Sequence, residues 1–218
     1  MTETISTTRV RMANKTDKPL TKSDFKIETL QLPSLEEGEV LCQTRFISLD
    51  PYLVGMMQSW QGPQRDWSNG IIVGRKVAQI IDSRDSNFNK GDWVAGDSRW
   101  QDIEVDKGKH LQKLVIDDAI SPSHYLGALG SSGITAWVGI NRVLPIEANK
   151  VMSISSAAGI VANIAGQLAM RKNAKVIGIA GGKTKCKQVV EDIGFDACVD
   201  HQRADLESRL ADTAQQFG

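Results

Sequence analysis

The segment from Lys150 to Gln216 alternates short apolar stretches with amphipathic ones, and this repeat restricts the fold more than any other feature. In the second amphipathic stretch the apolar residues recur at i, i+3, i+4 and i+7 from Cys186, and Gly194 stands where a helix-ending glycine is expected. The predicted strands are Lys150–Ser155, Lys175–Ala180 and Ala197–Val199, and the flanking predicted helices begin near Ile160 and Ala204. The order β-α-β-α-β-α predicts an α/β fold that contains the opening half of a doubly wound parallel sheet, a Rossmann half.

The chain before about Pro122 follows a different pattern, in which short strands are separated by turns. The predicted strands are Lys26–Leu32, Glu39–Arg45, Gly70–Ile81 and Asp92–Ala95. Such strands at turn-punctuated spacing indicate an antiparallel barrel or sandwich. Val54–Ser68 shows no clear periodicity and is interpreted as a loop, of the length that often carries function. We therefore expect a β-rich domain over residues 1–126 and an α/β domain over residues 127–218.

The turn between the first strand of the α/β part and its helix is the candidate dinucleotide site. It reads SSAAGIVA over Ser155–Ala162, with Ala157 and Gly159 at the first two glycine positions of the GxGxxG fingerprint and Ala162 at the third. Small side chains there allow backbone N–H groups and the helix N-terminus to approach a pyrophosphate. The alternative is a small-residue turn that only packs a strand against a helix.

The end of the second strand bears on the choice of cofactor. NAD-binding folds place an acid about 20 residues after the glycines to bind the ribose 2′-hydroxyl. This chain has no acid there and instead reads IAGGKTK over Ile179–Lys185. Lys185 would accept a 2′-phosphate, with Gly181 and Gly182 leaving room, so the sequence favours NADP(H) over NAD(H) and argues against a methyltransferase. The alternative is that Lys183 and Lys185 form a solvated helix start.

Composition and scattered residues exclude several other classes of protein. Lys and Arg number 26 and so do Asp and Glu, so the formal net charge is zero and a basic nucleic-acid surface is not supported. No apolar run approaches the length of a membrane span, and the N-terminus lacks the apolar core of a secretory signal. The cysteines Cys42, Cys186 and Cys198 lie far apart and form no CxxC, and none of the three histidines lies near a cysteine pair. We therefore expect reduced thiols, a cytoplasmic location and no metal site.

Five segments, in order, resemble one family. Gly127–Gly139 resembles the LGxxGxTAYxG segment of the zinc-independent medium-chain dehydrogenase/reductases. Four further segments resemble their DPYM, GDxV, AAxGxVG and GxAGGxxK motifs, namely Leu49–Tyr52, Gly91–Val94, Ala157–Ala162 and Gly178–Lys185. The nearest branch is that of the NADP-dependent 2-alkenal and leukotriene B4 12-hydroxydehydrogenases, and within it the bacterial curcumin reductases. The resemblance implies a GroES-like barrel over residues 1–126 and an NADP-binding Rossmann half over residues 127–218.

The resemblance also implies roles for single residues. The cofactor would be held by Thr135, Gly159, Ile160, Val161, Ala162, Gly181, Lys185 and His201, and Tyr52 would act on the substrate. Gly159–Ala162 would meet the pyrophosphate, Lys185 the 2′-phosphate, His201 the adenosine end and Thr135 the nicotinamide. Three of these residues have an alternative without a role in binding. Tyr52 would be an aromatic residue that packs its loop, Thr135 a helix-capping hydroxyl and His201 a surface residue.

The implied activity is NADPH-dependent reduction of the carbon–carbon double bond of an α,β-unsaturated ketone or aldehyde, with no metal and no nucleic acid or membrane partner. Full-length relatives are expected to be homodimers, and this chain is expected to lack the later strands of the dinucleotide fold. Ser131-Ser132 replaces the family's Met-Pro and Val54 replaces its Arg, which leaves the substrate preference open. The alternatives are a non-catalytic dinucleotide-binding fragment and a quinone reductase of the same superfamily.

Overall fold

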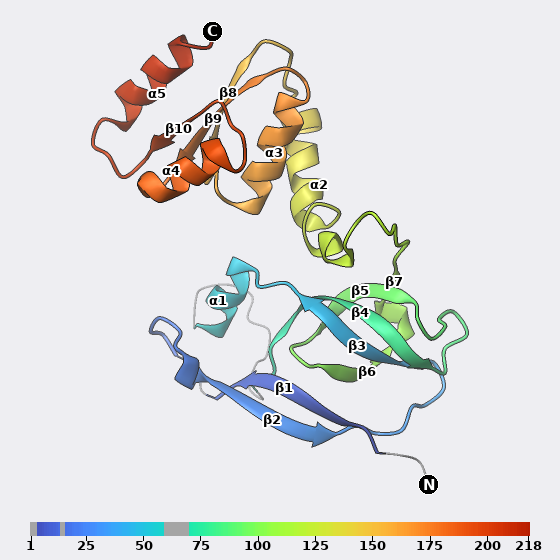
Figure 1. Cartoon of the computed structure of the whole chain (residues 1–218). Helices are drawn as coiled ribbons and strands as arrows, with labels where there is room; N and C mark the ends of the chain where they lie inside the picture. The colour runs from blue at the N-terminus through green and yellow to red at the C-terminus, as the bar shows by residue number, and fades with distance from the viewer. Residues whose placement is uncertain (1–3, 14–15, 59–69) are drawn as a thin grey trace. The chain divides into compact units, whose positions relative to one another are not determined.

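A computed structural model of the chain describes residues 4–13, 16–58 and 70–218. The chain divides into two compact units, Met1–Leu126 and Gly127–Gly218, each of which is described here by itself (Figure 1). Within the described residues no helix is long or apolar enough to cross a membrane.

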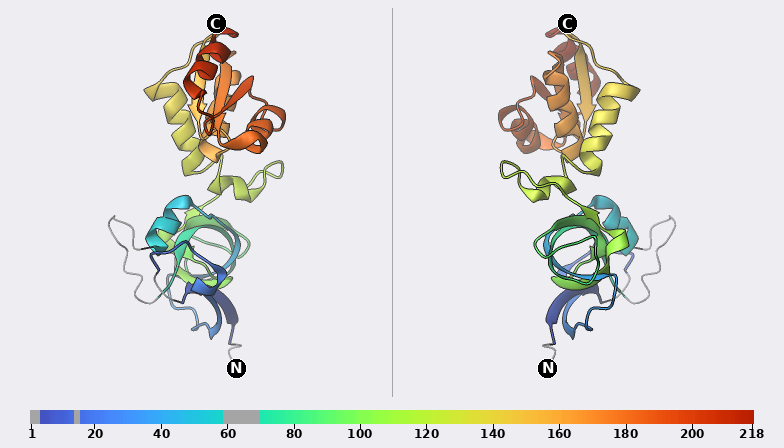
Figure 2. Two further views of the ribbon diagram at one scale, coloured as in Figure 1. Left: turned by 90° about the vertical axis from the view of Figure 1, so that its left-hand side faces the viewer. Right: turned by 90° about the vertical axis from the view of Figure 1, so that its right-hand side faces the viewer.

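The first unit is built on a five-stranded antiparallel sheet in the order β6-β3-β4-β5-β7. Its strands are β3 (Glu39–Ile47), β4 (Val73–Ser83), β5 (Trp93–Arg99), β6 (Ile103–Lys107) and β7 (Gln112–Lys113). Two register shifts between β3 and β4 mark irregularities of the kind that bend a strand. Figure 2 shows the sheet curling around an interior, as a barrel does. The second sheet of this unit pairs β1 (Ser6–Met12) with β2 (Phe25–Gln31), and a helix, α1 (Pro51–Met57), follows β3.

Side-chain alternation along the strands fills one part of the barrel interior with apolar groups. Because successive side chains of a strand point to opposite faces, Lys76, Ala78 and Ile80 of β4 share the inward face. Ala78 and Ile80 pack in a buried cluster with residues of neighbouring segments, namely Val40, Cys42, Phe88 and Val94. The same alternation therefore carries a lysine into the barrel.

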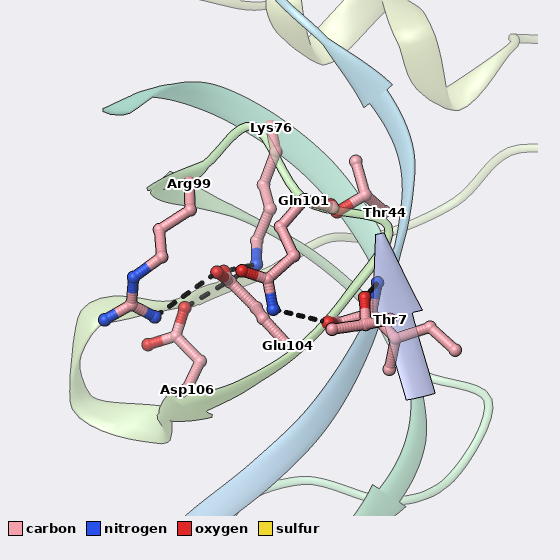
Figure 3. Close-up of polar contacts among 8 residues, drawn as sticks. Thr7, Thr44, Lys76, Arg99, Gln101, Glu104 and Asp106 are labelled. Carbon is pink, nitrogen blue, oxygen red and sulfur yellow. Dashed lines mark hydrogen bonds and ion pairs between the residues drawn. The ribbon is translucent and has the colours of Figure 1, made fainter. Parts of the chain in front are cut away.

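That lysine is the centre of a buried polar cluster (Figure 3). Lys76 and Glu104 are each 1% exposed, and the Lys76 Nζ donates a hydrogen bond to Glu104 Oε1. Asp106 Oδ2 lies 3.6 Å from Lys76 Nζ, and Arg99 Nη1 lies 3.6 Å from Glu104 Oε2. Two cations and two carboxylates thus balance one another, which is the condition under which charges are tolerated in an interior.

The second unit is a three-stranded parallel sheet in the order β10-β9-β8, with a helix after each strand (Figure 1). The elements are α2 (Ser131–Val138), a π-helical turn (Gly139–Val143), β8 (Val151–Ser155), α3 (Ile160–Met170), β9 (Lys175–Ala180), α4 (Gly182–Glu191), β10 (Ala197–Asp200) and α5 (Leu206–Gln215). The predicted strands and helices of this part are confirmed, with ends that differ by a residue or two. Gly194 adopts the left-handed conformation (φ 88°) beyond the end of α4.

The fold prediction of an α/β chain with an N-terminal β-rich part is confirmed, and one local interpretation is wrong. Val54–Ser68 was expected to be a loop, but its beginning, Val54–Met57, belongs to α1. Asp50 and Pro51 place a proline at the first helical position, where its missing N–H costs nothing, and this signal outweighs the lack of periodicity. Residues 59–68 of that segment lie outside the described residues. Three strands of the first unit, β1, β6 and β7, were not predicted.

Candidate functional site

The turn between β8 and α3 is held by its own backbone. Ala157 N–H donates to Ile179 O at 3.0 Å, and Gly159 N–H donates to Ser156 O at 2.7 Å. Ser156 is left-handed (φ 51°), and Gly159 is the residue from which α3 starts. Ala157 is fully buried, so a larger side chain would not fit beneath the turn. Small residues are therefore needed here for the turn itself.

The first N–H groups of α3 are unpaired. Among the described residues none accepts a hydrogen bond from the N–H of Ile160, Val161 or Ala162. The Ile160 and Val161 side chains are exposed, whereas Ala162 is buried. Free N–H groups at the start of an 11-residue helix form a site at which an anion is stabilised. The turn can thus do more than pack.

The turn between β9 and α4 is the second wall of the site. Gly182 is left-handed (φ 82°), and its N–H donates to Asp200 Oδ1 at 2.8 Å. A Cβ on Gly181 would stand 2.9 Å from Nε2 of His201, closer than real Cβ atoms approach. Glycine at 181 therefore lets the imidazole lie against the turn.

These two turns border one cavity of about 630 Å³. It is lined by Ser155, Ser156, Ala158, Gly159, Ile179, Ala180, Gly181, Lys185, Gln188 and His201. The structure thus brings together Gly159, Gly181, Lys185 and His201 of the predicted cofactor residues. Ile160, Val161 and Ala162 lie on the helix that begins at this cavity, without lining it themselves.

Lys185 is the cation of the cavity. Its side chain is exposed on α4, and within the described residues no carboxylate lies within ion-pair distance of its amine. Lys183 is exposed on the same helix but does not line the cavity. The sequence does not distinguish the two lysines, but in the structure only Lys185 lines the cavity.

Two predicted residues lie elsewhere. Tyr52 is 52% exposed in the first turn of α1, in the first unit. Thr135 lies within α2, and its hydroxyl donates to Ser131 O at 2.8 Å. It is therefore not the residue that caps the helix, since Gly130 holds that position. Neither side chain lines the cavity described above.

Several residues that line the cavity were given no individual role from the sequence, although all but Gln188 lie in the two segments that it singled out. They are Ser155, Ser156, Ala158, Ile179, Ala180 and Gln188. Most of them end β8 and β9 or follow directly after, and ligands of open α/β sheets bind outside the carboxyl ends of the strands. That rule was the available signal, because both strand ends were predicted correctly.

The ionisable groups near the cavity fall into two kinds. The N–H groups of Gly182 and Gln202 hold the pKa of the Asp200 carboxyl below its usual value, so it is charged at neutral pH. Burial, and next the adjacent Cys186 thiol, raise the pKa of Cys198 to about 12. In the first unit, away from this cavity, burial likewise raises the pKa of Cys42 to about 12. These two thiols are therefore protonated at neutral pH and are poor nucleophiles.

Comparison with known proteins agrees with this geometry. Residues 8–114 match the family described as the N-terminal domain of oxidoreductase. The chain is 36% identical over 190 residues to the NADPH-dependent curcumin reductase of Escherichia coli (strain K12). This match covers 86% of the chain and 54% of the relative. The chain is 32% identical over 197 residues to prostaglandin reductase 1 of Bos taurus, covering 89% and 58%. The chain belongs to the medium-chain dehydrogenase/reductase family.

Solved structures of this family support the assignment. CurA from Vibrio vulnificus superposes with a TM-score of 0.85 at 29% identity, covering 96% of the chain and 62% of CurA. The same protein has been solved in complex with NADPH, and that structure superposes with a TM-score of 0.81 at 30% identity. NADPH is thus the cofactor named for the curcumin reductase of Escherichia coli and for CurA, as the sequence predicts for this chain. The chain spans between 54% and 59% of the length of the first three curated relatives it matches.

Proposed function

We propose that the protein is an NADPH-dependent reductase of the carbon–carbon double bond of α,β-unsaturated ketones and aldehydes. The observation that carries the proposal is the cavity at the ends of β8 and β9, where Lys185 supplies a cation and the segment that ends β9 and follows it, Ile179–Lys185, carries no acidic residue. The relatives named curcumin reductase, prostaglandin reductase 1 and 2-alkenal reductase support this choice of reaction. Residues 1–126 would then be the GroES-like catalytic domain, and residues 127–218 the first half of the NADP-binding domain.

The two walls of the cavity offer different groups to the cofactor, namely backbone N–H groups at one wall and a lysine side chain at the other. The free N–H groups of Ile160, Val161 and Ala162 would bind the pyrophosphate, and Gly159 leaves the approach open. Lys185 would bind the 2′-phosphate, next to Gly181, and a charge-assisted contact of this type is stronger than a neutral one. His201 would lie along the adenosine end, while Thr135 is proposed to stand near the nicotinamide.

The reaction needs a hydride donor and a group that stabilises negative charge. When bound, NADPH would supply the hydride that the β-carbon of the substrate receives. Negative charge then develops on the carbonyl oxygen, and a hydrogen-bond donor at that oxygen lowers the barrier by a few kcal/mol. We assign this donor to the phenol of Tyr52, which α1 presents outside the core of the first unit. The phenol O–H would donate a hydrogen bond to that oxygen, and a proton from water at the α-carbon would complete the reduction.

The cofactor assignment is tested on the full-length protein with two lysine variants. We expect the parent to prefer NADPH to NADH in kcat/KM by at least about tenfold, the effect of roughly one charge-assisted contact. Lys185→Ala should raise the KM for NADPH about tenfold, with kcat and the KM for NADH nearly unchanged, because only the 2′-phosphate contact is lost. Lys183→Ala is the matched control and should change neither KM by more than about twofold.

The substrate class is tested in the same assay with a 2-alkenal, an enone and a quinone. Turnover of the first two supports the proposal, and turnover of the quinone alone would assign the chain to quinone reduction instead. Equal use of NADPH and NADH by the parent would contradict the cofactor assignment. No turnover of any of the three, with NADPH bound, would favour a non-catalytic dinucleotide-binding role.

A further inference from the structure

A carboxylate at the end of β10 joins the two loops that border the cofactor cavity. Asp200 Oδ1 accepts a hydrogen bond from Gly182 N–H at 2.8 Å and another from Gln202 N–H at 3.0 Å. Gly182 belongs to the turn between β9 and α4, and Gln202 to the turn after β10. One oxygen atom of Asp200 therefore joins the turn at Gly182, 18 residues earlier in the chain, to the turn that directly follows β10.

The bond to Gly182 changes what the start of α4 offers to a ligand. A helix N-terminus with free N–H groups attracts anions. At α4 the first of these groups is already bound by a carboxylate that is charged at neutral pH, because the two N–H groups keep its pKa low. The Gly182 N–H is therefore not available to an anion in the cavity, and Lys185 is a side-chain cation that lines the same cavity.

The same carboxylate fixes the place of His201. The residues on either side of His201 are bonded to each other, because the Gln202 N–H donates a hydrogen bond to the Asp200 carboxylate. His201 N–H donates to Ala180 O at 3.0 Å, and its ring lies so close to Gly181 that a Cβ there would stand 2.9 Å from Nε2. The imidazole is thereby kept on the wall of the cavity that also carries Lys185.

We propose that Asp200 is a positioning residue for the phosphate-bearing ribose end of NADP(H). It holds the β9–α4 turn and His201 in the arrangement in which the 2′-phosphate meets Lys185 and His201 and not the Gly182 N–H. The inference rests on the proposed function of the cavity as the NADP(H) site. Asp200 does not itself bind the phosphate, because two negative groups in contact would repel each other.

The test measures binding of 2′,5′-ADP and 5′-AMP to the full-length protein by calorimetry, without any turnover. Asp200→Ala should weaken 2′,5′-ADP about tenfold, as expected for a lost hydrogen bond to a charged group, and leave 5′-AMP within about twofold. Asp200→Asn keeps an acceptor oxygen at the same place. We expect it to bind 2′,5′-ADP within about threefold of the parent, which shows that geometry and not charge is what Asp200 contributes.

Asp196 provides the matched control. Its Oδ2 accepts a hydrogen bond from Val176 N–H at 2.8 Å, so it too binds a backbone N–H group with a carboxylate, but near the start of β9 and away from the cavity. Asp196→Ala should lower the thermal midpoint as Asp200→Ala does. It should leave the binding of 2′,5′-ADP within about twofold, since it moves no residue of the cavity wall.

The outcomes separate this inference from the proposed function. If Asp200→Ala weakens both probes equally, or weakens neither, the positioning role is wrong while the cofactor site stands. If the parent binds 2′,5′-ADP no more tightly than 5′-AMP, both the cofactor assignment and the positioning role are wrong. If the parent prefers 2′,5′-ADP but reduces no enone or enal, only the substrate class is wrong, and the comparison of the Asp200 variants still decides the positioning role.

Discussion

Gly166 of α3 faces the ring of Phe195, and no other residue would fit between them. A Cβ on Gly166 would stand 2.1 Å from Phe195 Cζ, and the ring is 2% exposed, so it has nowhere to move. Both belong to the core of the second unit. The glycine therefore allows α3 to pack closely over the segment that leads into β10, at the cost of some helix propensity.

We expect Gly166→Ala to destabilise the second unit by about 1–3 kcal/mol, the usual effect of overpacking a core. Gly139→Ala is the control, because Gly139 has helical backbone angles and nothing lies within 4 Å of its Cβ position. This control should be neutral or slightly stabilising. The free energy of unfolding in urea measures both, and equal effects of the two variants would show that the Phe195 contact does not matter.

At the scale of elements, strands β4 and β6 contribute the buried pair Lys76 and Glu104 to the barrel interior. Burial raises the pKa of the Glu104 carboxyl, and the Lys76 ammonium opposes this shift. The two strands are not neighbours in the sheet, since β3 lies between β6 and β4. The pair therefore links strands that share no backbone hydrogen bonds.

Lys76→Met should destabilise the protein by about 3–5 kcal/mol, because it leaves a buried carboxylate without its partner. Without Lys76 the pKa of Glu104 rises further. A carboxyl whose pKa is higher in the folded than in the unfolded protein contributes its full stability at pH values below the unfolded pKa. That contribution is lost as the pH rises through the folded pKa. The variant should therefore be more stable to urea at pH 5 than at pH 8, relative to the parent at each pH.

Two further variants check the cause of that effect. Lys76→Met combined with Glu104→Leu removes both charges and should recover most of the lost stability. Lys175→Met breaks an exposed pair with Asp196 and should cost no more than about 1 kcal/mol. A loss for Lys76→Met that is independent of pH and is not recovered in the double variant would argue against a role for the charge pair.

At the scale of the whole molecule, the two units divide the histidines and cysteines between them. Cys42, His110 and His124 lie in the first unit, and Cys186, Cys198 and His201 in the second. Over the described ranges, no three His, Cys, Asp or Glu side chains gather in a group that could hold a metal ion. A zinc site requires three or four such ligands around one point.

We therefore expect a chelator to leave the NADPH-dependent turnover of the full-length protein unchanged. Metal analysis of the purified protein, with an enzyme of known zinc content treated in parallel, is the measurement. Stoichiometric zinc, or a loss of activity that added zinc restores, would contradict this expectation.

The sequence was sufficient for the architecture of the second unit. The strand predicted over Lys175–Ala180 has the same bounds as β9. Gly194, predicted as a helix-ending glycine, adopts the left-handed conformation after α4. Strands of a parallel sheet are buried on both faces, so they read as short apolar runs, and helix ends depend on nearby residues. Both signals are local, and a local signal is fully present in the sequence.

The first unit and the finer geometry of the cavity were decided by tertiary structure. β1 (Ser6–Met12) carries Arg9 and Arg11 and lacks an apolar pattern, so its pairing with β2 was not evident. The burial of Lys76 depends on Glu104, and the place of Gly182 depends on Asp200. Each of these contacts requires strands from distant parts of the chain to be in register, and register is fixed only when the whole sheet packs.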